Sequence, residues 1–152
     1  MNIFVDTREK QRAIKKIVAE FEKQGVGYAS TKLFVGDYQR ADNSLLVIDR
    51  KQNLLEVCTN VGQDRERFVR ELKRAREMGV KIIFLVEHGK DVNSLEEVKK
   101  WQNPRLKDSP LALSGERLYK ILSVLEKNYG CEFQFCTKNE TGTRIIQLLG
   151  GE

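Results

Sequence analysis

The stretch 35-VGDYQRADNSLLVIDRK-51 decides the fold, because a polar turn separates two segments that suit β-strands. It predicts paired strands over residues 28–35 and 45–51. Residues two apart on an extended strand project from the same face, so we expect Asp49 and Lys51 to lie together. Asp37, at the end of the preceding strand, could meet them across the sheet. The stretch therefore predicts two carboxylates and an ammonium group at one point of a β-hairpin.

These side chains suit the hydrolysis of a phosphodiester. Asp37 and Asp49, with the carbonyl of Arg50, offer the hard oxygen ligands that Mg²⁺ or Mn²⁺ prefers, and such a metal activates water. Lys51 would orient that water or neutralise the developing oxyanion. Asp6 would complete the acidic cluster from the end of the first strand. The residues predict a metal-dependent nuclease, although a turn acid and an exposed ion pair remain open alternatives.

The composition is that of one soluble globular domain over residues 1–152. No apolar run approaches the roughly 20 residues that cross a bilayer, and the first residues lack a signal-peptide pattern, so we expect no membrane partner. Three cysteines without a Cys-x-x-Cys spacing favour free thiols in the cytoplasm. A single histidine makes a zinc site unexpected. The formal net charge of +5 tolerates a polyanion without proving one.

Apolar periodicity predicts an alternation of strands and helices along the chain. The expected strands cover residues 2–6, 28–35, 45–51, 81–87 and 131–137. The expected helices cover residues 10–23, 64–78, 115–128 and 143–149, with a short one at 94–101. Residues 52–62 receive no element. This order argues for an α/β sandwich, in which helices flank a mixed central β-sheet.

The helix at 64–78 is expected to have a buried face, a solvated face and charged residues between the two. Its apolar stripe is expected to be buried, and Arg70 and Arg74 are expected on the solvated face. Arg67 and Glu71 border the stripe, which consists of Phe68, Leu72 and Ala75, so they are better placed to support the site.

Beyond this helix, Trp101 lies among basic residues and either covers the edge of the core or stacks on unpaired bases. His88 is expected to be an exposed loop residue.

Several short motifs follow one another on the predicted elements. They are 5-VDTRE-9, 36-GDY-38, 49-DRK-51, 67-RFVRE-71 and 85-LVE-87. Together they resemble the nuclease domain of the XPF family, which belongs to the PD-(D/E)xK group of metal-dependent nucleases. The resemblance implies a restriction-endonuclease-like core with Mg²⁺ or Mn²⁺. It also implies a catalytic role for Arg50, which strand spacing places on the face opposite Asp49, and a phosphate contact for Arg8, otherwise an exposed partner of Glu9.

The same resemblance implies a DNA endonuclease that acts on branched or flapped DNA in repair, recombination or replication. A homodimer is a further expectation, since the family tends to dimerise through this domain. Too little chain follows Thr137 for the DNA-gripping modules of larger members. We therefore expect a stand-alone domain of the kind found in a phage or bacterial genome, working in the cytoplasm of a bacterial host or a phage-infected cell.

The chain departs from the family pattern at a few positions. Asp49 replaces a glutamate, Leu55 replaces the last motif acid with Glu56 beside it, and Glu71 replaces a glutamine. A catalytically inactive DNA-binding or scaffold domain is therefore the rival reading, favoured by Leu55. The retained Asp37, Asp49 and Lys51 argue against it. An RNA-directed or restriction-type nuclease of the same fold also stays open, since nothing visible discriminates a 2′-hydroxyl.

Overall fold

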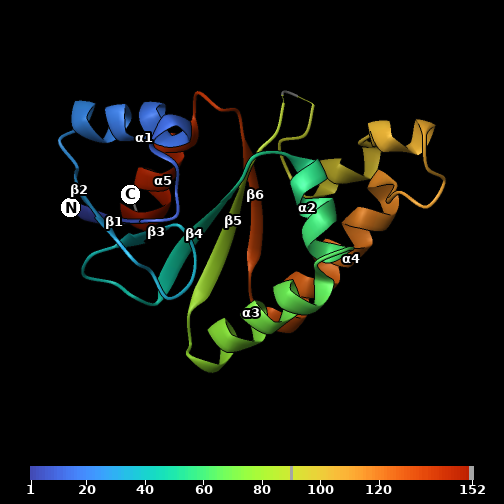
Figure 1. Ribbon diagram of the computed structural model, residues 1–152, viewed down its shortest axis with the longest axis horizontal. Coiled ribbons are helices and arrows are strands. Elements are labelled where there is room, and N and C mark those ends of the chain that lie inside the picture. Colours follow the sequence, from blue (N-terminus) through green and yellow to red (C-terminus); the bar gives the residue numbers. More distant parts are fainter. Residues whose placement is uncertain (90, 151–152) are drawn as a thin grey trace.

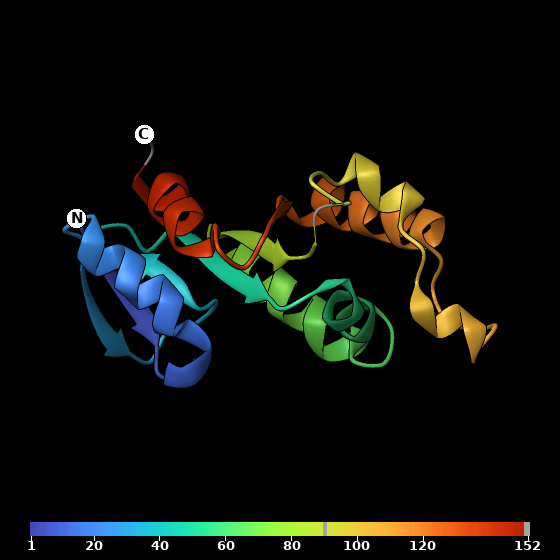
Figure 2. The same cartoon turned by 90° about the horizontal axis from the view of Figure 1, so that it is seen from above.

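The computed structural model describes residues 1–89 and 91–150, which form a six-stranded mixed sheet with helices on both faces (Figures 1 and 2). The sheet order is β2-β1-β3-β4-β5-β6. β1 is parallel to β2, β4 and β6 are parallel to β5, and β3 is antiparallel to β1 and β4. The predicted mixed sheet is therefore confirmed. The strands are β1 (Asn2–Asp6), β2 (Gly27–Thr31), β3 (Tyr38–Arg40), β4 (Leu46–Lys51), β5 (Lys81–Glu87) and β6 (Glu132–Cys136).

The helices divide between the two faces of the sheet (Figure 2). One apolar cluster joins β4, β5 and β6 to α2, α3 and α4, and a second joins β1, β4 and β5 to α1 and α5. The predicted helices are confirmed within a few residues, but 94–101 forms only a short 3-10 helix, η1 (Glu96–Lys100). The other helices are α1 (Gln11–Lys23), α2 (Leu54–Val61), α3 (Arg65–Glu77), η2 (Pro104–Lys107), α4 (Gly115–Tyr129) and α5 (Thr141–Gly150).

Side-chain alternation along β4 decides which residues share a face. Val47 belongs to the cluster under α2, α3 and α4, whereas Ile48 belongs to the cluster under α1 and α5. Because successive side chains of a strand point to opposite faces, Asp49 and Lys51 follow Val47, and Arg50 follows Ile48. The strand thus delivers one charged pair to the α3 side and one arginine to the α1 side.

The predicted pairing of residues 28–35 with residues 45–51 is wrong. The first of these segments forms β2, an edge strand parallel to β1, and the antiparallel partner of β4 is the short strand β3. Between them Gly36 has a φ of +78°, and a Cβ there would lie 2.9 Å from the side chain of Val47. Only glycine allows this sharp turn close to β4. Asp37 consequently precedes a strand instead of ending one.

Helix α2 was absent from the sequence prediction. Its N-cap Asn53 accepts a hydrogen bond from the Glu56 N–H at 2.9 Å, and Glu56 Oε1 accepts one from the Gln52 N–H at 2.7 Å. This reciprocal arrangement resembles a capping box, and the Asn-x-x-Glu spacing was its signal in the sequence. The helix matters because it directly follows the charged end of β4.

One expectation from composition, the free cysteines, agrees with the structure. The cysteines of the described residues are free, and Cys131 and Cys136 belong to the clusters on opposite faces of the sheet. None of the described helices is both long and apolar enough to span a bilayer.

Candidate active site

The end of β4 brings Asp49 and Lys51 together on the α3 side, as predicted. Lys51 Nζ lies 3.3 Å from Asp49 Oδ1, and only about a tenth of the lysine side chain is exposed. The ammonium also lies 5.7 Å from the ring centroids of Phe68 and Phe84. Burial lowers the pKa of Lys51, but the carboxylates of Asp49, Glu56 and Asp37 outweigh it and raise that pKa. Lys51 is therefore a fixed, nearly dehydrated cation.

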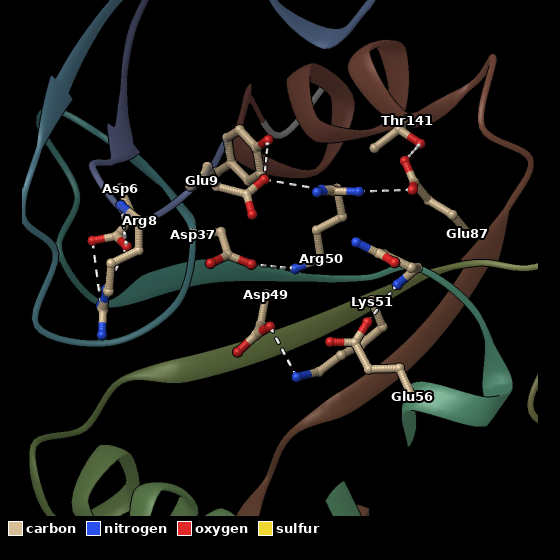
Figure 3. A network of polar contacts seen from close by, with 12 residues as sticks. Asp6, Arg8, Glu9, Asp37, Asp49, Arg50, Lys51, Glu56, Glu87 and Thr141 are labelled. Atoms are coloured by element: carbon tan, nitrogen blue, oxygen red, sulfur yellow. Dashed lines mark hydrogen bonds and ion pairs between the residues drawn. The ribbon is translucent and has the colours of Figure 1, made fainter. Parts of the chain in front are cut away.

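Asp37 reaches this place through main-chain hydrogen bonds to both neighbouring strands. Its N–H donates to the Ile48 carbonyl at 2.8 Å, and its carbonyl accepts from the Asp6 N–H at 2.8 Å. Its side-chain Oδ2 accepts from the Arg50 N–H at 2.8 Å (Figure 3). Burial, together with repulsion from the Asp49 carboxylate, raises the pKa of Asp37 to about 9. The loop thus holds a second acid beside Asp49, in surroundings that favour the protonated form of Asp37.

Arg50 lies on the opposite face of the sheet, as strand spacing predicted. Its Nε donates to Glu9 Oε2 and its Nη1 donates to Glu87 Oε1, each at 2.9 Å. Thr141 donates to the other oxygen of Glu87 (Figure 3). The Tyr38 hydroxyl donates to Glu9 at 2.8 Å. The arginine side chain is 6% exposed. These contacts fix Arg50, whose N–H in turn holds Asp37.

Asp6 and Arg8 form a separate pair at the end of β1. The Asp6 carboxylate accepts from Arg8 Nε at 2.6 Å and from the Leu33 N–H at 2.8 Å. Burial raises the pKa of Asp6, but these hydrogen bonds outweigh burial and lower it. In Figure 3 this carboxylate is turned to Arg8, apart from those of Asp37 and Asp49. Asp6 holds the loop before Asp37 through its hydrogen bond to the Leu33 N–H. Its role in catalysis stays a prediction.

Arg8 has a different partner from the alternative that the sequence offered. It pairs with Asp6, and not with Glu9, and its Nη2 also donates to the Leu33 carbonyl at 3.2 Å. Two thirds of its side chain is exposed. Arg8 therefore keeps accessible surface near the site, and its phosphate contact stays a prediction.

Helix α3 contributes unequally to the site. Glu71 is half-buried, and burial together with the Asp49 carboxylate raises its pKa. Arg67 is 76% exposed and pairs with Asp64 at 3.4 Å, so its contact is not with the site. Arg74 is exposed as predicted, but its Nη2 also donates to the Phe34 carbonyl at 3.2 Å and its guanidinium covers the Phe34 ring. The helix brings Glu71 near Asp49, and through Arg74 it holds the loop that contains Phe34.

The residues after β5 are more buried than the sequence indicated. Trp101 is 7% exposed, which agrees with a residue at the edge of the core. The prediction of an exposed His88 is wrong, because its side chain is 16% exposed and meets the Trp101 ring edge-on at 6.0 Å. Burial lowers the pKa of His88. Both rings are packing residues.

Sequence reasoning named the acids that surround Arg50 and Lys51 but did not predict these contacts. Glu9 and Glu87 clamp Arg50, and Glu56 caps α2 while acting on Lys51. The signal for Glu87 was its place at the end of a fully apolar strand, where a charged group needs a partner. Leu55, at the position of the missing motif acid, packs instead against the core on the α2 side.

The donor set fits a hard divalent cation. No group of three or more His, Cys, Asp or Glu side chains converges on one point within residues 1–89 and 91–150. Asp37 and Asp49 supply two carboxylates, and Arg50, the residue after Asp49, offers its carbonyl as a further oxygen. Mg²⁺ is commonly held by one or two carboxylates, with waters and substrate phosphates completing its shell. The mutual repulsion that raises the pKa of Asp37 is the kind that a cation would relieve.

Comparisons with known proteins identify the fold and the family of the chain. The chain is similar in structure to XPF from Aeropyrum pernix, with a TM-score of 0.69 and 21% identity, and to the same protein in complex with DNA, with a TM-score of 0.68 and 21% identity. Each match covers 98% of this chain but only 63% of the other. No curated protein matches the chain. The model of the ERCC4 domain matches residues 5–149. The chain therefore belongs to the ERCC4 domain family of XPF-type nuclease domains, with their restriction-endonuclease-like fold.

Proposed function

We propose that this protein is a Mg²⁺- or Mn²⁺-dependent DNA endonuclease that hydrolyses phosphodiester bonds in branched or flapped DNA. The observation that carries the proposal is the convergence of Asp37, Asp49 and Lys51 at the end of β4. An ion pair made only for stability would leave the buried Asp37 unexplained, because an acid forced beside another acid costs folding free energy.

Each side chain has a distinct task. Asp37 and Asp49 would hold the metal, with the carbonyl of Arg50 as a third oxygen. When bound, the metal supplies Lewis-acid activation of water and charge stabilisation at phosphorus. Lys51 stays cationic and lies within 3.3 Å of Asp49, so it can neutralise charge that develops on a phosphate oxygen there. Glu9 and Glu87 hold Arg50, and the Arg50 N–H orients Asp37.

The comparisons support DNA as the substrate without specifying its structure. XPF from Aeropyrum pernix has been solved with DNA, and this chain shares its fold over 98% of its own length. A single nuclease domain over residues 1–152 and a homodimer remain part of the proposal. The rival is a catalytically silent scaffold of the same fold. Leu55 favours that rival, whereas the retained acid–acid–lysine group favours an enzyme.

A cleavage assay separates the two. Purified protein is incubated with labelled flap, fork and linear DNA, and with matching RNA, in Mg²⁺, Mn²⁺ or EDTA. We expect metal-dependent cleavage of the branched DNA that Asp37→Ala and Lys51→Ala abolish while circular dichroism shows the fold retained. Arg70→Ala, on the exposed face of α3, is the matched control and should cut normally. Cleavage that survives both site substitutions would refute the assignment.

A further inference from the structure

A basic cavity lies on the face of β4 that carries Arg50, opposite Asp49 and Lys51. A cavity of about 390 Å³ opens between the first half of α1, the end of β4 and the loop that follows β6. The loop and helix are joined by a hydrogen bond from Lys16 Nζ to Asn139 Oδ1 at 3.2 Å. Figure 1 shows this loop rising beside α1 at the same end of the sheet as the end of β4. The lining includes Arg12, Lys15, Lys16, Gln52 and Lys138.

Three of the cations around this cavity lack partners among the described residues, whereas Lys16 and Arg50 are engaged. The side chains of Arg12, Lys15 and Lys138 are exposed, and none of them makes a hydrogen bond or an ion pair with the rest of residues 1–89 and 91–150. Arg12 and Lys15 on α1 and Lys138 in the loop after β6 repel one another, and no described acid pairs with them. Like charges gathered around a concave surface raise the local concentration of anions.

The acids near the cavity are already engaged. Glu87 lines it, but one carboxylate oxygen accepts from Arg50 and the other from Thr141. Glu140, beside Lys138 in the loop, accepts from the N–H and the hydroxyl of Thr137. Glu9 is taken by Arg50 and Tyr38. The positive charge is therefore left for a ligand from outside.

The start of α1 strengthens the preference for an anion. Arg12 and Ala13 belong to its first turn and line the cavity. The N-cap Lys10 makes no side-chain capping bond, and the first turn holds no acidic residue. The Ala13 N–H donates to the Lys10 carbonyl at 2.9 Å, so the contribution of the helix start to the cavity is the positive end of its dipole.

The cavity and the candidate active site lie on opposite faces of the end of β4, and residues that alternate along the chain contribute to each. Arg50 lines the cavity and follows Asp49, and Gln52 lines it and follows Lys51. We propose that this cavity is a second phosphate-binding site, which takes phosphodiester groups of the nucleic-acid strand that continues from the Asp37–Asp49 pair. The inference rests on the proposed function and adds to it a path for the substrate strand over the end of β4.

The test reverses charge at two positions from different segments. The variant is Lys15→Glu/Lys138→Glu, and the control is Lys120→Glu/Lys127→Glu, which makes the same charge change on the exposed side of α4. Binding of fluorescein-labelled single-stranded and flap DNA is measured by anisotropy in EDTA over a range of salt concentrations. We expect the variant to bind about tenfold more weakly and the slope of log K against log salt to fall by about 1.4, at about 0.7 per lost contact.

The outcomes separate this inference from the proposed function. Wild-type protein that binds DNA but never cleaves it would refute the nuclease proposal while the binding comparison still decides the cavity. In active protein the variant should recover the wild-type cleavage rate at saturating DNA. The cavity site is overturned if wild type binds no DNA, if the variant keeps wild-type affinity and salt slope, or if the α4 control loses as much affinity.

Discussion

The Arg50 N–H donates to Asp37 Oδ2 at 2.8 Å, while the Arg50 side chain is held on the opposite face by Glu9 and Glu87. One residue thereby connects the acid of the candidate site to a buried network on the far side of the sheet. Because Arg50 is clamped from two sides, the strand that carries Asp49 and Lys51 has little freedom to shift. The geometry of the site depends on contacts that never touch the substrate.

Removing Glu87 should therefore damage both stability and activity. Glu87→Ala leaves the guanidinium of Arg50 buried with one partner, and breaking a buried pair in this way costs about 3–5 kcal/mol. Urea denaturation measures the loss, and Arg70→Ala, which breaks an exposed pair with Glu66, should change little. Equal stability of the two variants would show that the buried network does not fix β4.

Asp37→Asn should stabilise the metal-free protein in a pH-dependent manner. The folded state raises the pKa of Asp37 to about 9, so between pH about 4 and 9 it binds a proton that the unfolded chain releases. This group therefore lowers stability as pH rises through that window, by at most about 1.4 kcal/mol per pH unit. Asparagine removes the penalty. Unfolding in EDTA at about pH 5 and about pH 8 should show an advantage for the variant that grows with pH; a shrinking advantage would contradict the argument.

Lys51→Met should lower the cleavage rate with little effect on DNA affinity. The substitution keeps the aliphatic stem over Phe68 and Phe84 but removes the cation beside Asp49. Loss of one group that stabilises transition-state charge costs about 10²–10³ in rate. Single-turnover kinetics test this, and Lys73→Met on the exposed face of α3 is the control. A variant whose rate matches wild type would exclude Lys51 from the chemistry.

Mg²⁺ should raise the melting temperature of the wild-type protein, and Asp49→Asn should reduce that rise. A ligand that binds only the folded state stabilises it by mass action. Glu66→Gln, which changes a carboxylate that is 95% exposed, should keep the wild-type response. The same Mg²⁺-dependent rise in both variants would place the metal elsewhere.

Local patterns predicted the parts of the fold that depend on neighbours in sequence. The alternation along β4 correctly separated Asp49 and Lys51 from Arg50. The helix expected over residues 115–128 is α4, which Ser114 caps and the left-handed Gly130 ends. The capping pattern Asn-x-x-Glu of α2 was present but was overlooked. These features need only the spacing of side chains along one segment.

Long-range pairing could not be predicted in the same way. β2 pairs with β1, and the chain then turns at Gly36 so that β3 becomes the partner of β4. The spacing of residues in the sequence does not show which of these strands become neighbours. The clamp on Arg50 joins residues 37 and 41 positions away in the chain. No periodicity in the sequence records such contacts, so the network behind the site emerged only from the structure.

The most direct test of the central claim is a crystal structure of the protein soaked in Mn²⁺, with anomalous data collected to locate the ion. The account predicts an anomalous peak between the carboxylates of Asp37 and Asp49 that disappears in Asp49→Asn crystals. A well-ordered site with no peak there, or a peak bound by other residues, would contradict it.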